Sequence, residues 1–108
     1  MIRAFVLYLA LFVMGCPPVD RAVGAACNGD RDCQDRCLTD WPGGFCTLNC
    51  RDDRDCPTDA VCTDTRGGVC LMLCDSSREC RDLLDDNDYE CDDRRNVRGG
   101  RDDVCVPD

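Results

Sequence analysis

Apolar residues form one continuous run near the start of the chain and occur only singly or in short groups afterwards. The run covers ten residues, from Ala4 to Val13, and follows a single positive charge at Arg3. Ten residues of helix reach roughly 15 Å, about half the hydrocarbon thickness of a bilayer. The run is therefore too short to span a membrane, and its length fits the apolar region of an export signal. A buried core helix is the alternative, but the chain has no second long apolar run for it to pack against.

After this run, the pattern predicts short strands, tight turns and little regular secondary structure. Residues around 60–62 and 68–73 are mostly apolar or cysteine and flank a turn at 63–68, so we expect a small hairpin. Pairs of adjacent glycines, at 43–44, 67–68 and 99–100, supply the positive φ that hairpin turns need. Asp30, Asp53 and Ser77 are placed to cap a single helical turn. Residues 81–88 are expected to add a helical turn, and residues 17–26 an unstructured tether.

The cysteines repeat with a regular spacing. When Cys16 is set aside, the other twelve form three sets of four, joined by three-residue connectors at 47–49 and 71–73. The first loop of each set follows the pattern C-x-x-[DS]-R-[DE]-C, and a glycine pair precedes each last cysteine. This recurrence indicates three tandem units, at 27–46, 50–70 and 74–105. The cysteines of the units are Cys27, Cys33, Cys37 and Cys46; Cys50, Cys56, Cys62 and Cys70; and Cys74, Cys80, Cys91 and Cys105.

Composition makes these cysteines the main expected source of stability. Only 16 of the 82 residues from 27 to 108 are apolar residues other than cysteine and glycine, too few for an ordinary core. We therefore predict a small disulfide-rich fold of three tandem four-cysteine units, each a capped turn plus a short β-hairpin. Spacing leaves three pairings open within a unit. We expect every bridge to stay within its unit, and we favour first-to-third and second-to-fourth, because interlaced bridges tie the turn to both strands.

The thirteenth cysteine directly follows the apolar run. The sequence VMGC, ending at Cys16, resembles the bacterial lipobox, in which a small residue precedes a cysteine that is acylated and becomes the N-terminus. The resemblance implies a signal peptide at 1–15, a lipid on Cys16, a flexible tether at 16–26 and a cysteine-rich domain at 27–108. Val and Met replace the family's preferred Leu and Ala or Ser. The alternative is ordinary signal cleavage at the small-x-small sequence VGA, residues 23–25.

The cysteine pattern from residue 27 onward resembles the Dickkopf N-terminal type of cysteine-rich repeat. It is more similar to the short cysteine-rich lipoproteins predicted in gliding Gram-negative bacteria, with their C-x-x-D-x-D-C loops. The resemblance implies a disulfide-knotted repeat in the bacterial cell envelope, and Pro17 after the acylated cysteine favours the outer membrane. It implies little about activity, because cysteine spacing specifies a scaffold onto which function is grafted.

Composition also argues against enzymes and nucleic-acid binding. The chain has neither histidine nor lysine, so no serine or cysteine nucleophile has an imidazole partner. Three aromatic residues after residue 26 are too few to build a glycosidase cleft. A net charge of −9 repels nucleic acid and anionic lipid headgroups. We expect no catalysis and no cofactor.

Metal binding is the remaining chemistry of cysteines and carboxylates. The chain has C-x3-C pairs but no C-x-x-C, and export with an even cysteine count favours disulfides over zinc. Acidic residues alternate in the loops at 30–32 and 53–55 and cluster at 85–88. The cluster lacks the glycine and glutamate of an EF-hand loop, so we favour capping and solvated carboxylates over a calcium site, with weak calcium binding as the alternative.

One aromatic residue is a candidate binding tip. Trp41 begins the turn sequence WPGG and is the only tryptophan of the chain. Trp41 either lies at the tip of an exposed loop, where it would contact a protein or glycan partner, or covers the disulfides of the first unit. We expect a non-catalytic, lipid-anchored envelope protein with an extracytoplasmic binding or structural role. The alternative is a secreted, inhibitor-like binding module without an anchor.

Overall fold

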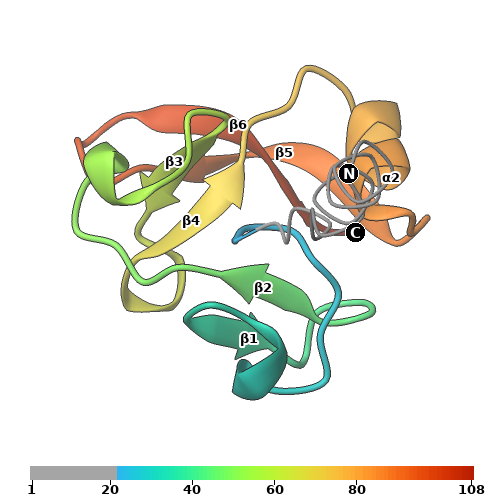
Figure 1. Cartoon of the computed structure of the whole chain (residues 1–108). Coiled ribbons are helices and arrows are strands. Elements are labelled where there is room, and N and C mark those ends of the chain that lie inside the picture. The colour runs from blue at the N-terminus through green and yellow to red at the C-terminus, as the bar shows by residue number, and fades with distance from the viewer. Residues whose placement is uncertain (1–21) are drawn as a thin grey trace, which may run out of the picture.

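In the computed structural model, which describes residues 22–108, each four-cysteine unit forms one antiparallel hairpin (Figure 1). A short helical turn precedes each hairpin, so the predicted fold class is confirmed. The hairpins are β1 (Arg36–Leu38) with β2 (Phe45–Thr47), β3 (Ala60–Thr63) with β4 (Val69–Met72), and β5 (Tyr89–Arg95) with β6 (Arg101–Pro107). The preceding helices are η1 (Asp30–Asp32), η2 (Asp53–Asp55) and α2 (Ser77–Leu84), while η3 (Thr65–Gly67) lies in the turn of the second hairpin.

The third and fourth cysteines of each unit lie directly opposite each other across the hairpin, but they bond to other partners. The opposed pairs are Cys37 with Cys46, Cys62 with Cys70, and Cys91 with Cys105. In every unit the first cysteine bonds to the third and the second to the fourth, as predicted, and all six bridges stay within their units. The bridges are Cys27–Cys37, Cys33–Cys46, Cys50–Cys62, Cys56–Cys70, Cys74–Cys91 and Cys80–Cys105.

The third unit is longer than the others and contains the α-helix. Its helix α2 has eight residues and begins four residues before the predicted helical turn at 81–88. The hydroxyl of Ser76 caps the helix by accepting a hydrogen bond from the Glu79 amide. The helix ends at Leu84, and the residue after it, Asp85, is the C-cap and has a left-handed φ of 50°. The prediction of a helical turn was therefore correct, but its position was wrong. The N-cap is Ser76, so the helix begins well before Leu83 and Leu84, on which the prediction was centred.

Glycine is required where the first cysteine of a unit passes the hairpin turn. A Cβ atom at Gly44 would lie 1.8 Å from the carbonyl oxygen of Cys27, and one at Gly68 would lie 2.5 Å from that of Cys50. Both glycines also have positive φ. Because these glycines lack a side chain, the segment that carries the first cysteine can approach the turn closely enough for hydrogen bonding, and the Cys50 amide donates to the Gly68 carbonyl at 3.0 Å.

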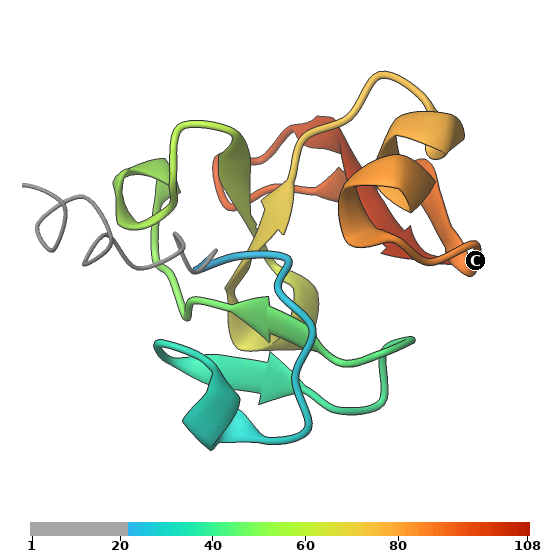
Figure 2. The same cartoon turned by 45° about the vertical axis from the view of Figure 1, so that its right-hand side comes forward.

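The three hairpins lie next to one another (Figure 2), and buried residues from all three form one main core cluster, although too few apolar residues were expected for a core. Thr47, the last residue of β2, donates its hydroxyl to the Cys70 carbonyl of the second unit at 2.6 Å, and both Thr47 and Thr63 are fully buried. The Val97 amide of the third unit donates to Cys62 of the second at 3.2 Å. The count of apolar residues missed this core because it left out the half-cystines and the two threonines that are buried with the apolar side chains.

Residues 22–26, which we call the strap, pack against the second strand of the first hairpin. The Gly24 amide donates to the Cys46 carbonyl and the Cys46 amide donates to the Ala25 carbonyl, both at 2.8 Å. The side chain of Val23 is 5% exposed and belongs to the shared core. The expectation of an unstructured tether is therefore wrong for residues 22–26, because a single valine and two backbone hydrogen bonds give this short segment a site on the domain.

Candidate functional site

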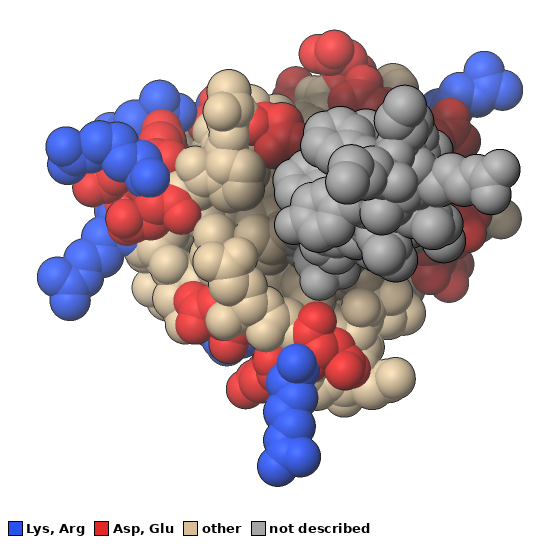
Figure 3. All heavy atoms as spheres, viewed as in Figure 1, with Lys and Arg blue, Asp and Glu red and all other residues tan. Residues whose placement is uncertain are grey.

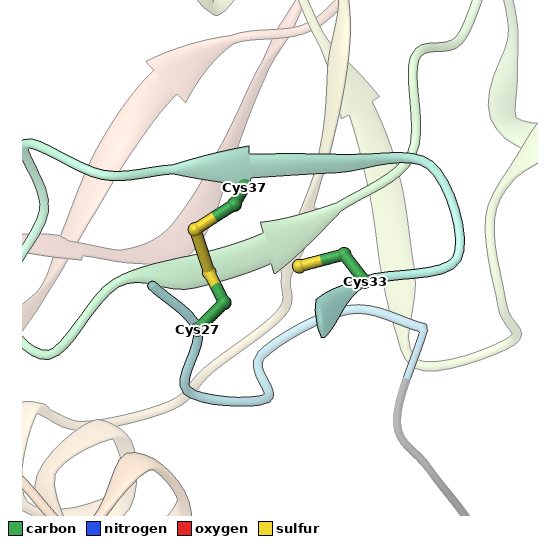
Figure 4. A group of neighbouring side chains, drawn as sticks. All are labelled: Cys27, Cys33 and Cys37. Carbon is green, nitrogen blue, oxygen red and sulfur yellow. A yellow bond between two sulfur atoms is a disulfide. The ribbon is translucent and has the colours of Figure 1, made fainter. Parts of the chain in front are cut away.

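The two bridges of each unit lie against each other and bring three sulfur atoms within 4.8 Å of one another. Figure 4 shows this cluster in the first unit, where Cys33 lies beside the bridge between Cys27 and Cys37. A zinc site needs thiolate ligands, and each of these sulfurs is instead bonded to a second sulfur. The three clusters are therefore pairs of cross-links, and six disulfides in a small domain indicate an oxidising, extracytoplasmic location.

The repeated loop residue three positions after each unit's first cysteine holds the hairpin against the loop. Asp30 accepts a hydrogen bond from the backbone amide of Cys37 at 2.9 Å, and Asp53 does the same for Cys62 at 2.9 Å. In the third unit, the hydroxyl of Ser77 accepts from the amide of Cys91 at 3.0 Å. The prediction that these residues cap the turn is wrong: they are the first helical residues, and their side chains reach the strand that carries the third cysteine.

The second acidic residue of the repeated loop, which precedes the second cysteine, bonds to the backbone at the start of the same loop in the first two units. Asp32 accepts a hydrogen bond from the Asn28 amide at 2.8 Å, and Asp55 accepts from the Arg51 amide at 2.9 Å. In the separate acidic segment at 85–88, Asp86 accepts a hydrogen bond from the Asp88 amide at 2.8 Å. These carboxylates, which the sequence also offered as calcium ligands, therefore bind backbone amides of their own loops.

Trp41 lies in the shared core and does not form an exposed tip. Its side chain is 7% exposed, and its ring centroid lies 5.0 Å from that of Phe45 and 6.3 Å from that of Tyr89. Tyr89 belongs to the third unit, and its hydroxyl donates to the carbonyl of Pro42 in the first at 2.7 Å. This position differs from the binding tip considered above, because the third hairpin supplies an aromatic partner that sequence spacing does not reveal.

Burial changes the acidity of the phenol in this aromatic cluster. Removal from water raises the pKa of Tyr89 to about 12, and the nearby carboxylate of Asp86 adds to the shift. Both effects favour the neutral phenol, which donates the hydrogen bond to Pro42. The first and third units are thus joined by a contact that needs the phenol proton.

A shallow surface groove lies where the first unit meets the second. Its volume is about 790 Å³, and its lining combines side-chain amides, carboxylates, one guanidinium and glycine backbone. A second groove, of about 450 Å³, shares Gln34 with it and continues towards the strap. The larger groove is lined by Gln34, Asp35, Leu48, Asn49, Cys50, Arg51, Asp55, Gly67 and Gly68.

Arginine and aspartate side chains pair over the surface, and the face in Figure 3 shows basic side chains standing beside acidic ones. The guanidinium of Arg66 lowers the pKa of Asp40, and that of Arg101 lowers the pKa of Asp93. Solvent screens these exposed pairs, so each contributes little to stability. Arg98 differs, because it joins Asp53 of the second unit at 3.1 Å to Asp102 of the third at 2.8 Å.

The predicted lipid-bearing residue, Cys16, and the apolar run before it lie outside the described residues. Within residues 22–108, no helix has the length and apolar character needed to cross a bilayer. Comparisons of the chain with protein families, with characterised proteins and with solved structures find no match.

The buried phenol predicts an alkaline transition. The ordinary pKa of tyrosine is 10.0 and that of Tyr89 is about 12, so the folded protein holds this proton more tightly than the unfolded chain. The resulting stabilisation is complete below pH 10 and is lost as the pH rises towards 12. We expect tyrosinate absorbance, taken as the difference between the parent and Tyr89→Phe, to titrate near pH 12. Titration near pH 10 would contradict the buried contact.

The hydrogen bond from the Cys37 amide to Asp30 predicts a stepwise loss of stability when Asp30 is substituted. Asp30→Ala leaves the Cys37 amide without its side-chain acceptor and should cost about 1 kcal/mol, which lowers the melting temperature by roughly 4–8 °C. Asp30→Ser should restore part of this loss, because Ser77 performs the same role in the third unit. The exposed neighbour Arg31 provides the control as Arg31→Ala. Thermal unfolding with the disulfides intact measures all three, and equal stability of the Ala and Ser variants would contradict the assignment.

Proposed function

We propose that the protein is a non-catalytic lipoprotein of the bacterial cell envelope, anchored through Cys16, whose disulfide-rich module binds a partner or has a structural role outside the cytoplasm. The observation that carries this proposal is the complete pairing of the other twelve cysteines within three units. Pairing leaves Cys16 as the single cysteine without an intrachain partner, and it stands directly after a small residue and an apolar run. This is where a lipobox requires its cysteine.

The position of the strap supports cleavage upstream of it. Ordinary signal cleavage after Ala25 would remove Val23 from the core and would also remove the Gly24 amide that donates to Cys46. Cleavage before Cys16 keeps the strap whole. The secreted alternative depends on cleavage after Ala25, which would remove these contacts from the folded domain.

The groove between the first two units is the surface that best fits a binding role. Its amide and carboxylate groups, together with Arg51, can exchange hydrogen bonds with a protein or a glycan. The absence of histidine and lysine from the chain supports a role without catalysis. The acidic net charge of −9 supports a partner other than nucleic acid.

Changing Cys16→Ser tests the anchor. Without the sulfur that carries the acyl chain, we expect the protein to leave the membrane fraction or to keep its signal peptide, and to incorporate no labelled fatty acid. Val13→Leu is the matched control: it brings the lipobox closer to the family preference and should preserve both labelling and membrane association. A Cys16→Ser variant that fractionates, migrates and labels like the parent would contradict the lipoprotein proposal.

A further inference from the structure

The strap contacts all three units. Its backbone bonds to Cys46 of the first unit. Its glycine, Gly24, lies against Met72, the last residue of β4 in the second hairpin, and against Leu84 of the third unit. A Cβ atom at Gly24 would lie 2.6 Å from the Met72 sulfur and 3.3 Å from a methyl carbon of Leu84. The φ of Gly24 is 100°, which also disfavours any other residue. The strap is therefore held as part of the module.

The docked strap limits the distance between the module and its anchor. Five residues, 17–21, separate Cys16 from the strap. The six Cα–Cα steps from residue 16 to residue 22, at a maximum of about 3.6 Å each, span at most about 22 Å, whatever their conformation. If the strap were free, the eleven steps to residue 27 would be available and the limit would be about 40 Å. Docking of the strap thus reduces the available reach to about half.

We propose that the strap holds the module against the headgroup surface of the bilayer that carries its lipid anchor. This inference rests on the proposed acylation of Cys16. Acidic side chains outnumber arginines in the module, as they do in the whole chain of net charge −9, so the module has no net attraction to anionic headgroups. The short connection, and not a basic patch, therefore keeps it at the surface. Proximity to the bilayer should therefore be insensitive to salt, unlike an electrostatic contact.

The single tryptophan provides a probe for this distance. Trp41 lies in the same core cluster as Val23 of the strap. The acylated full-length product, purified from membranes, is placed in phosphatidylcholine vesicles that contain dansyl-labelled headgroups, and energy transfer from Trp41 to dansyl is measured. We expect efficient transfer at both low and high salt. A fifteen-residue Gly/Ser insertion between residues 21 and 22 adds roughly 20 Å of root-mean-square reach and should lower the transfer at least two-fold.

Substitution within the strap tests docking itself. Gly24→Val should displace the strap and lower the transfer towards the value of the insertion variant. Gly29→Val is the matched control, because a Cβ atom at Gly29 meets nothing within 4 Å and its φ is extended. Hydrogen exchange of the Cys46 amide, which donates to Ala25, gives an independent readout that needs no lipid. We expect exchange at least ten-fold faster in Gly24→Val than in the parent and unchanged protection in Gly29→Val.

The possible failures are distinguishable. If Cys16 carries an acyl chain but the insertion leaves the transfer unchanged, the inference is wrong while the lipoprotein proposal stands. Transfer that falls with rising salt would also overturn it, since the contact would then be electrostatic. If Cys16 carries no acyl chain, the proposed function fails and the inference fails with it. Protection of the Cys46 amide that does not depend on Gly24 would show that the strap is not held as described.

Discussion

The crossed pair of disulfides in each unit is the constraint on which the rest of the structure depends. The third and fourth cysteines face each other on strands that backbone hydrogen bonds already join, so a bridge between them would add little. Each bonds instead to the loop before the hairpin, which cross-links the loop to both strands. The bridges span 10 to 25 residues. In the chain-entropy account, each loop closure of this size stabilises the folded state by about 3 kcal/mol.

The units are cross-linked separately but packed together. Two-stranded hairpins are only marginally stable by themselves, and each hairpin here is stabilised by contacts with its neighbours. Tyr89 reaches from the third unit to Pro42 of the first, Thr47 reaches from the first to the second, and Arg98 joins the second to the third. The strap completes this arrangement at the N-terminal side, where Val23 enters the common core. These contacts join the three units into one domain, and the grooves are parts of its surface.

The sequence predicted whatever repeats along the chain and missed whatever depends on contacts between units. The spacing of the cysteines and the positions of the glycine pairs led to the prediction of three hairpins and of the disulfide pairing. Both the cysteines and the glycine pairs recur at equivalent positions in the three units. Asp30 was assigned to a cap because a capping carboxylate and one that reaches a strand seven residues later look identical in sequence. Val23 was assigned to a linker, and Trp41 to either a tip or a cover for the first unit's disulfides, because the core residues around them come from distant parts of the sequence. Tyr89, for example, packs against the ring of Trp41.

Cleavage of the unreduced protein tests the crossed pairing most directly. Met72 is the only methionine after residue 14, so cyanogen bromide in denaturing acid should release a fragment of residues 73–108 that carries two closed bridges. Trypsin then divides this fragment into peptides 73–78, 79–81, 82–94 and 102–108, each with one cysteine. We predict that mass spectrometry finds 73–78 linked to 82–94, and 79–81 linked to 102–108. Any other pairing, or a fragment that stays attached to residues before 73 until a reductant is added, would contradict the account.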